Sequence, residues 1–135
     1  MSVQLHRSMV AVPASVPALR SDVAAFARAV GVHEPLLSSV KLAVSEAVTN
    51  AVLHAYVGRR PGAVRVAAWI DDGSLLIEVA DDGDGMMPRL DSPGLGVGLP
   101  FIADTADSLD ISSPPDGGAQ LRMSFALHRA AQHCA

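Results

Sequence analysis

The sequence is short of the residues on which several common functions depend. Its single cysteine, Cys134, cannot form an internal disulfide, and no spacing typical of a cysteine and histidine zinc site occurs. Aromatic residues make up only 4% of the chain, too few to build the stacking surfaces that bind single-stranded nucleic acid. The formal net charge is -4 and no dense cluster of lysine and arginine occurs, so nucleic acid is not expected as a partner.

Long hydrophobic runs are also absent. No apolar run approaches the roughly 20 residues that cross a bilayer, and no basic region followed by an apolar run marks a signal peptide. We therefore expect no membrane partner and a cytoplasmic location. What the sequence does contain is 50% hydrophobic residues over 135 positions, enough for a real core. That length predicts a single domain over residues 1–135, with its core at about 3–128.

The hydrophobic pattern alternates between the period of a strand and that of a helix. It predicts a strand, two helices, a hairpin, a third helix and two further strands. The expected ranges are 3–12, 15–30, 34–55, 64–70, 75–79, 98–106, 109–111 and 121–127. This order is typical of an α/β (α+β) two-layer sandwich, in which a mixed, mostly antiparallel sheet carries its helices on one face.

The most informative segment is the second half of the long predicted helix. Glu46, Asn50 and His54 follow one another at steps of four, which places them along one edge of an otherwise apolar helix. An amide oxygen can bind magnesium together with phosphate oxygens and water, and a nearby carboxylate is then free to accept a proton. The alternative is a solvated helix edge, with Glu46 exposed and Asn50 bonded locally. We expect His54 to be structural, as a cap of this helix.

A second polar segment, Asp81-x-Gly83-x-Gly85, comes directly after a predicted strand. A carboxylate at a strand end can accept a hydrogen bond from a buried amine, and the glycines permit close approach of a ligand to the backbone. The alternative is an ordinary Asp-Gly turn. We expect Asp82 and Asp84 to be solvated turn residues.

The third segment, Gly94-x-Gly96-x-Gly98, enters a helix, where exposed amides and the helix dipole favour phosphate. A glycine triplet alone is a weak signal, but the order of the three segments is specific. It resembles the ATP-binding domain shared by gyrase, heat-shock chaperones, histidine kinases and mismatch-repair proteins, the histidine kinase-like (GHKL) ATPases. Within that superfamily, the stretches EAVTNAVLHAY, VADDGDGM and GLGVGLPFI are most similar to the anti-sigma factor serine kinases of bacteria, over roughly residues 3–127.

The resemblance implies the histidine kinase-like ATPase (Bergerat) fold, ATP and Mg²⁺ as cofactors, and a role for each matching residue. Glu46 would be the general base toward a serine hydroxyl, Asn50 would ligate Mg²⁺, and Asp81 would hold adenine. The remaining implied nucleotide contacts are Gly83, Gly85, Met86, Gly94, Gly96, Gly98 and Leu99. The implied partners are a small STAS-type anti-anti-sigma protein as the substrate and a sigma factor, bound by a homodimer of the kinase.

The sequence departs from the family pattern in two places. Family kinases usually carry an arginine just before the glycine triplet, where this chain has Ser92 and Pro93, so Arg89 is the candidate phosphate contact. Ala119 replaces the threonine that is expected near adenine. These departures leave a second function open, that of a nucleotide-binding module that regulates transcription through protein binding without phosphoryl transfer.

Overall fold

The computed structural model of the chain describes residues 4–83, 98–115 and 117–127. Each helix and strand predicted from the sequence is present, with its ends shifted slightly. In chain order the elements are β1 (Gln4–Val10), α1 (Ser15–Ala29), α2 (Leu36–Asn50), η1 (Ala51–Ala55), β2 (Ala63–Asp71), β3 (Ser74–Asp81), α3 (Gly98–Thr105), β4 (Ser108–Ser112) and β5 (Ala119–Ala126).

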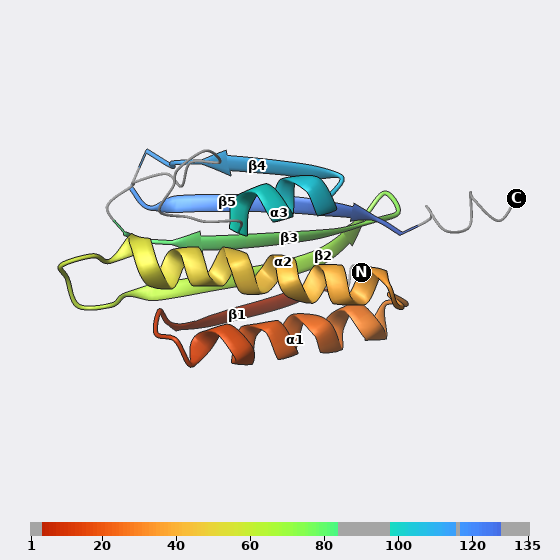
Figure 1. The fold of residues 1–135 in the computed structure, drawn as a ribbon, viewed down its shortest axis with the longest axis horizontal. Coiled ribbons are helices and arrows are strands. Elements are labelled where there is room, and N and C mark those ends of the chain that lie inside the picture. The colour runs from red at the N-terminus through yellow and green to blue at the C-terminus, as the bar shows by residue number, and fades with distance from the viewer. Residues whose placement is uncertain (1–3, 84–97, 116, 128–135) are drawn as a thin grey trace, which may run out of the picture.

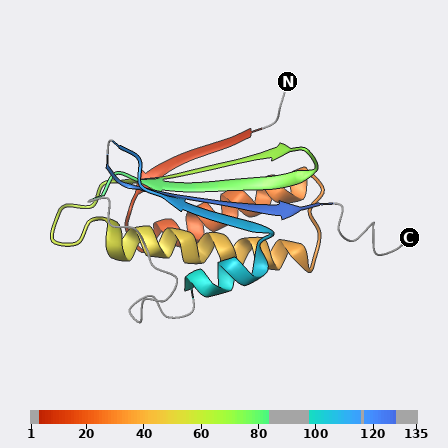
Figure 2. The same cartoon turned by 90° about the horizontal axis from the view of Figure 1, so that it is seen from above.

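The strands form one sheet in the order β1-β2-β3-β5-β4. Each neighbouring pair in this sheet is antiparallel, so the mixed sheet that we expected is antiparallel throughout its described strands. Helices α1, α2 and α3 all lie on one face of the sheet, as Figures 1 and 2 show from two directions. The predicted two-layer arrangement with helices on one face is therefore confirmed.

The core lies between the two layers and follows from the alternation of side chains along the strands. The three central strands align their apolar positions, because Val79 of β3 is paired with Val66 of β2 and Leu121 of β5. A shift of one residue in this register would turn the apolar side chains to the other face of the sheet. Helix α2 meets these strands with a stripe of buried residues, which are Leu37, Val40, Ala43, Val44, Ala47 and Val48.

The long second helix changes its hydrogen bonding before it ends. The sequence predicts an unbroken helix to residue 55, whereas the structure replaces the last turn by the π-helix η1 at Ala51–Ala55. By length and composition the combined helix Leu36–Ala55 could cross a membrane, although Lys41 and Glu46 interrupt its apolar residues. Its apolar character has a simpler physical cause here, because the helix forms the centre of the layer that packs on the sheet.

Candidate functional site

A small cleft opens where the end of the long helix faces the ends of β3 and β5. Its cavity volume is about 30 Å³, which is room for water or for the polar edge of a ligand. The helix side is built from alanines at steps of four, whose short side chains leave the space open. The residues that line the cleft are Ala47, Asn50, Ala51, His54, Ala55, Val79, Asp81, Ile111, Ala119, Gln120 and Leu121.

Asn50 is the polar residue that the helix contributes to the buried part of this cleft. Its side chain is only 9% exposed, and among the described residues Nδ2 has no hydrogen-bond partner. A buried polar atom without a partner costs on the order of 1–3 kcal/mol. A half-turn of the amide would present its oxygen at the same place. The position therefore suits a ligand group that pairs with the amide.

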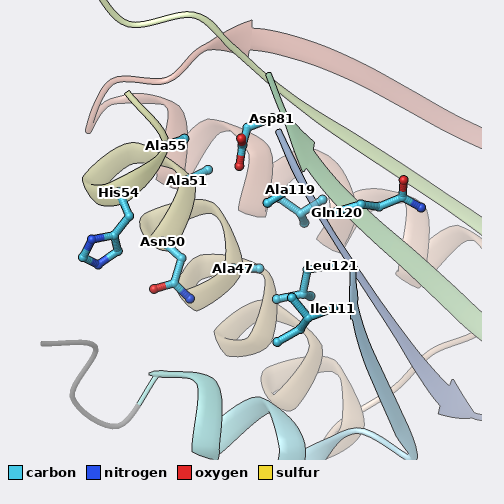
Figure 3. Close-up of a pocket in the computed structure, with 11 residues that line it drawn as sticks. Ala47, Asn50, Ala51, His54, Ala55, Asp81, Ile111, Ala119, Gln120 and Leu121 are labelled. Carbon is cyan, nitrogen blue, oxygen red and sulfur yellow. The ribbon is translucent and has the colours of Figure 1, made fainter. Parts of the chain in front are cut away.

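Asp81 stands on the opposite side of the cleft, at the end of β3 (Figure 3). Its carboxylate is half-buried, and this desolvation raises the pKa of Asp81 above its ordinary value of 3.8. The backbone N–H of Gly83 donates to Oδ1 at 2.9 Å, which favours the ionised form and limits the rise. Oriented in this way, the carboxylate is a hydrogen-bond acceptor suited to an amine.

Two glycines allow the turn after β3 to fit between its neighbours. A Cβ atom on Gly83 would overlap the carbonyl oxygen of Ala55, and one on Gly118 would overlap that of Asp81. Gly118 also has a φ of +83°, in the region that favours glycine. We expected Gly83 to let a ligand approach the backbone. In the structure, the group that lies close to Gly83 is the backbone carbonyl of Ala55, at the end of η1.

Asp82 is exposed, as expected of a solvated turn residue, and it is also bound at three points. Its backbone N–H donates to the hydroxyl of Tyr56 at 2.8 Å, and its carbonyl oxygen accepts from Arg59 at 3.4 Å. Its carboxylate forms an ion pair with Arg65 at 2.6 Å. The side chain stays exposed, as expected, and the contacts come from residues far along the chain, which local turn statistics ignore.

The structure thus brings Asn50 and Asp81 to one cleft, and Ala119 lies directly opposite Asp81 in the pairing of β3 with β5. Glu46 is partly exposed on α2, one helical turn before Asn50, and is not among the residues that line the cleft. His54 does line it, and Figure 3 shows its imidazole turned away from Asp81.

The remaining predicted contacts are only partly described. Gly98 and Leu99 form the first turn of α3. The other predicted positions lie outside the described residues, namely Gly85, Met86, Arg89, Gly94 and Gly96.

The described residues contain no group of three or more His, Cys, Asp or Glu side chains that could enclose a metal ion. Magnesium does not require such a group, since it retains several waters and binds one or two protein oxygens together with phosphates. The Asn50 amide fits this donor set.

A family model for the histidine kinase-like ATPase domain matches residues 9–125. The chain belongs to this family. Relatives of this ATPase domain include the anti-sigma F factor of Caldanaerobacter subterraneus subsp. tengcongensis, 35% identical over 121 residues that cover 82% of this chain and 84% of the relative. The anti-sigma F factor of Clostridium acetobutylicum is 36% identical over 121 residues, covering 80% of this chain and 84% of the relative. Among the histidine kinase-like ATPases, the chain is similar in sequence to the anti-sigma factors.

Two solved structures share the fold. The RsbU and RsbW domains of Rv1364c from Mycobacterium tuberculosis align with a TM-score of 0.73 and 22% identity, over 92% of this chain and 32% of that chain. The blue-light activated histidine kinase EL346 of Erythrobacter litoralis aligns with a TM-score of 0.61 and 24% identity, over 74% of this chain and 33% of that chain. This chain spans about a third of each of these longer chains.

Proposed function

We propose that this protein is an ATP-binding anti-sigma factor that phosphorylates a serine of a STAS-type anti-anti-sigma protein and sequesters a sigma factor. The observation that carries the proposal is the cleft that joins an unpaired, buried amide at Asn50 to a half-buried carboxylate at Asp81. One group suits a magnesium-bound phosphate and the other suits the amine of adenine. The names of the anti-sigma F relatives support a sigma factor as one partner.

In this function the chain positions ATP and removes one proton. Asp81 would accept a hydrogen bond from the exocyclic amine of adenine, and the Asn50 amide oxygen would hold Mg²⁺. Mg²⁺, when bound, neutralises the charge of the phosphates. The serine oxygen forms a bond to the terminal phosphorus as the bond from that phosphorus to ADP breaks, and Glu46 accepts the hydroxyl proton. Glu46 lies one turn before Asn50 and is partly exposed, which this role requires.

The outer side of this helix also suits a protein partner. Leu42 and Leu53 are 52% and 58% exposed, and both lie on the continuous helix that carries Glu46. These two side chains leave apolar surface uncovered on this helix, and the proposal assigns that surface to the partner. We further propose that the chain acts as a homodimer. Sedimentation velocity of the purified protein, with and without ATP, tests this, and a monomer at all concentrations would contradict it.

Transfer of the terminal phosphate of radiolabelled ATP to a cognate anti-anti-sigma protein tests the kinase. We expect Glu46→Gln to retain ATP binding and to lose roughly a hundredfold or more of the transfer rate, since a general base contributes about that much. Glu34→Gln is the matched control, because Glu34 lies at the other end of α2, where it accepts hydrogen bonds from Ser38. Equal transfer by the Glu46 variant and the wild type would exclude Glu46 as the base.

A second candidate function follows from the sequence before the glycine triplet. Ser92 and Pro93 stand where family kinases carry an arginine, and Ala119 lacks the hydroxyl expected beside Asp81. Both changes favour a protein that binds nucleotide and sequesters a sigma factor without phosphoryl transfer. The same experiment separates the two functions, because this protein would bind ATP and the sigma factor yet leave the anti-anti-sigma protein unlabelled.

A further inference from the structure

Tyr56 joins three elements through one hydroxyl group. It directly follows η1 and is 8% exposed. Its hydroxyl donates to the carbonyl oxygen of Ala63 at 2.7 Å, where β2 begins, and accepts the backbone N–H of Asp82 at 2.8 Å, just after β3. The donor and the acceptor of this hydroxyl are thus both used by backbone groups.

The surroundings fix the position of this hydroxyl. A Cβ atom added to Gly62 would come within 2.7 Å of ring atom Cε1 of Tyr56, so the ring lies directly against the backbone of Gly62. The guanidinium of Arg59 also lies over this ring, 5.4 Å from its centroid. A ring confined in this way holds its hydroxyl at one place relative to β2.

The bond to Asp82 acts on Asp81 because the two residues share a peptide group. The N–H that Tyr56 receives belongs to the plane that also contains the carbonyl of Asp81. That carbonyl lies against Gly118 of the neighbouring strand end, and Oδ1 of Asp81 accepts from Gly83. Holding this plane sets the direction in which the Asp81 side chain leaves the backbone and enters the cleft.

The hydroxyl keeps its proton under ordinary conditions. Burial raises the pKa of Tyr56 above its usual value of 10.0, and the nearby carboxylates of Asp81 and Asp82 raise it further. The donor that Ala63 requires is therefore present throughout the neutral range. Tyr56 therefore holds the turn after β3 to the start of β2 through both hydrogen bonds.

We propose that Tyr56 is a positioning residue for adenine recognition: through Asp82 it orients the Asp81 carboxylate toward the exocyclic amine of the base. This inference rests on the proposed ATP binding. It predicts that the hydroxyl of Tyr56 controls the preference for ATP over a purine triphosphate without that amine, although Tyr56 itself need not touch the base. A purely structural hydroxyl would affect the binding of both nucleotides alike.

Calorimetric titration of Tyr56→Phe with ATP and with purine riboside triphosphate tests the proposal. We expect the affinity for ATP to fall roughly tenfold, as for one hydrogen bond to a charged group, while the affinity for the analogue stays unchanged. Ser108→Ala is the matched control, because it removes a hydroxyl that pairs with Ser124 at 2.6 Å near the far end of β5. This control should bind both nucleotides as the wild type does.

A second variant alters the hydroxyl without removing it. Because Tyr56 is the single tyrosine of the sequence, biosynthetic incorporation of 3-fluorotyrosine changes this residue alone, and a flip of the ring lets its one fluorine avoid the edge at Gly62. While the phenol keeps its proton, fluorination weakens the oxygen as an acceptor for Asp82. At a pH well below the pKa of the fluorinated phenol, the ratio of ATP affinity to analogue affinity should therefore fall in the same direction. An unchanged ratio in both variants would overturn the role of Tyr56 and leave ATP binding intact. A wild-type chain that binds neither nucleotide would overturn the proposed function together with this inference.

Discussion

Two residues of the cleft are held in states that cost the folded protein free energy. Asn50 buries an amide nitrogen that has no partner among the described residues, and Asp81 keeps a carboxylate half-buried. Groups of this kind are rare in cores and common at sites that bind ligands, because the ligand provides the hydrogen-bond partner that the protein lacks. These two groups thus lower the stability of the protein without ligand and favour the binding of one.

The cost at Asp81 predicts a specific pH dependence of stability. Its folded-state pKa is raised above 3.8 by burial, so the native protein binds the proton more tightly than the unfolded chain does. The stability that Asp81 contributes is complete below the unfolded pKa and is lost as the pH rises through the folded pKa. We expect the free energy of unfolding of the wild type to fall relative to that of Asp81→Asn across this window and then to level off. Denaturant melts at a series of pH values measure the difference, and parallel curves would contradict it.

At the scale of elements, the contact between the turn after β3 and the end of η1 depends on the absence of one side chain. The carbonyl of Ala55 occupies the space that a Cβ on Gly83 would need. We expect Gly83→Ala to destabilise the fold by about 1–3 kcal/mol, the usual cost of overpacking. Thermal and urea unfolding measure this.

Gly58→Ala is the informative comparison for Gly83→Ala. Gly58 has a φ of +75°, but a Cβ atom added there would have no neighbouring atom within 4 Å, so the substitution carries a backbone penalty without a steric one. That penalty is about 1–2 kcal/mol. Only Gly83→Ala should also weaken ATP binding, because only that turn carries Asp81. A loss of ATP affinity in both variants would show that general destabilisation, rather than the turn, is responsible.

The elements themselves could be predicted because each is encoded locally. The step of four between Glu46 and Asn50 gives the helix edge, and the alternation of Val64, Val66 and Ala68 gives a strand buried on one side. The π-helix at the end of the long helix could not be predicted, because its hydrogen bonds change without any break in the apolar pattern. The contacts of Asp82 with Arg65 and Tyr56 could not be predicted either, since these residues are 17 and 26 positions away.

At the scale of the whole molecule, the one-sided sandwich explains why distant segments share a cleft. The end of the long helix and the end of β3 lie at the same edge of the two layers, and β5 begins there because Asp81 pairs with Ala119. The sheet order that inserts β5 between β3 and β4 is not encoded in any local period. Periodicity therefore could not predict that the separate motifs form one site. That prediction came from the resemblance to the family.

Because the cleft spans both layers, ATP should stabilise the molecule as a unit. A ligand at a hundred times its dissociation constant adds about 2.7 kcal/mol to the free energy of unfolding. We expect this gain in urea melts with Mg²⁺-ATP, with an unchanged dependence on urea. Asn50→Leu should lose most of the Mg²⁺-dependent part of the gain, whereas Thr49→Val, the adjacent control, should keep it.

Hydrogen exchange locates the same effect within the fold. Amides near the cleft in α2, β3 and β5 should gain protection with Mg²⁺-ATP, whereas those of β1, at the far edge of the sheet, should gain protection only where exchange requires global unfolding. Protection that is confined to β1 and α1 would place the nucleotide elsewhere. Since Asn50 and Asp81 lie on different layers, protection of one layer alone would mean that the cleft does not act as one site.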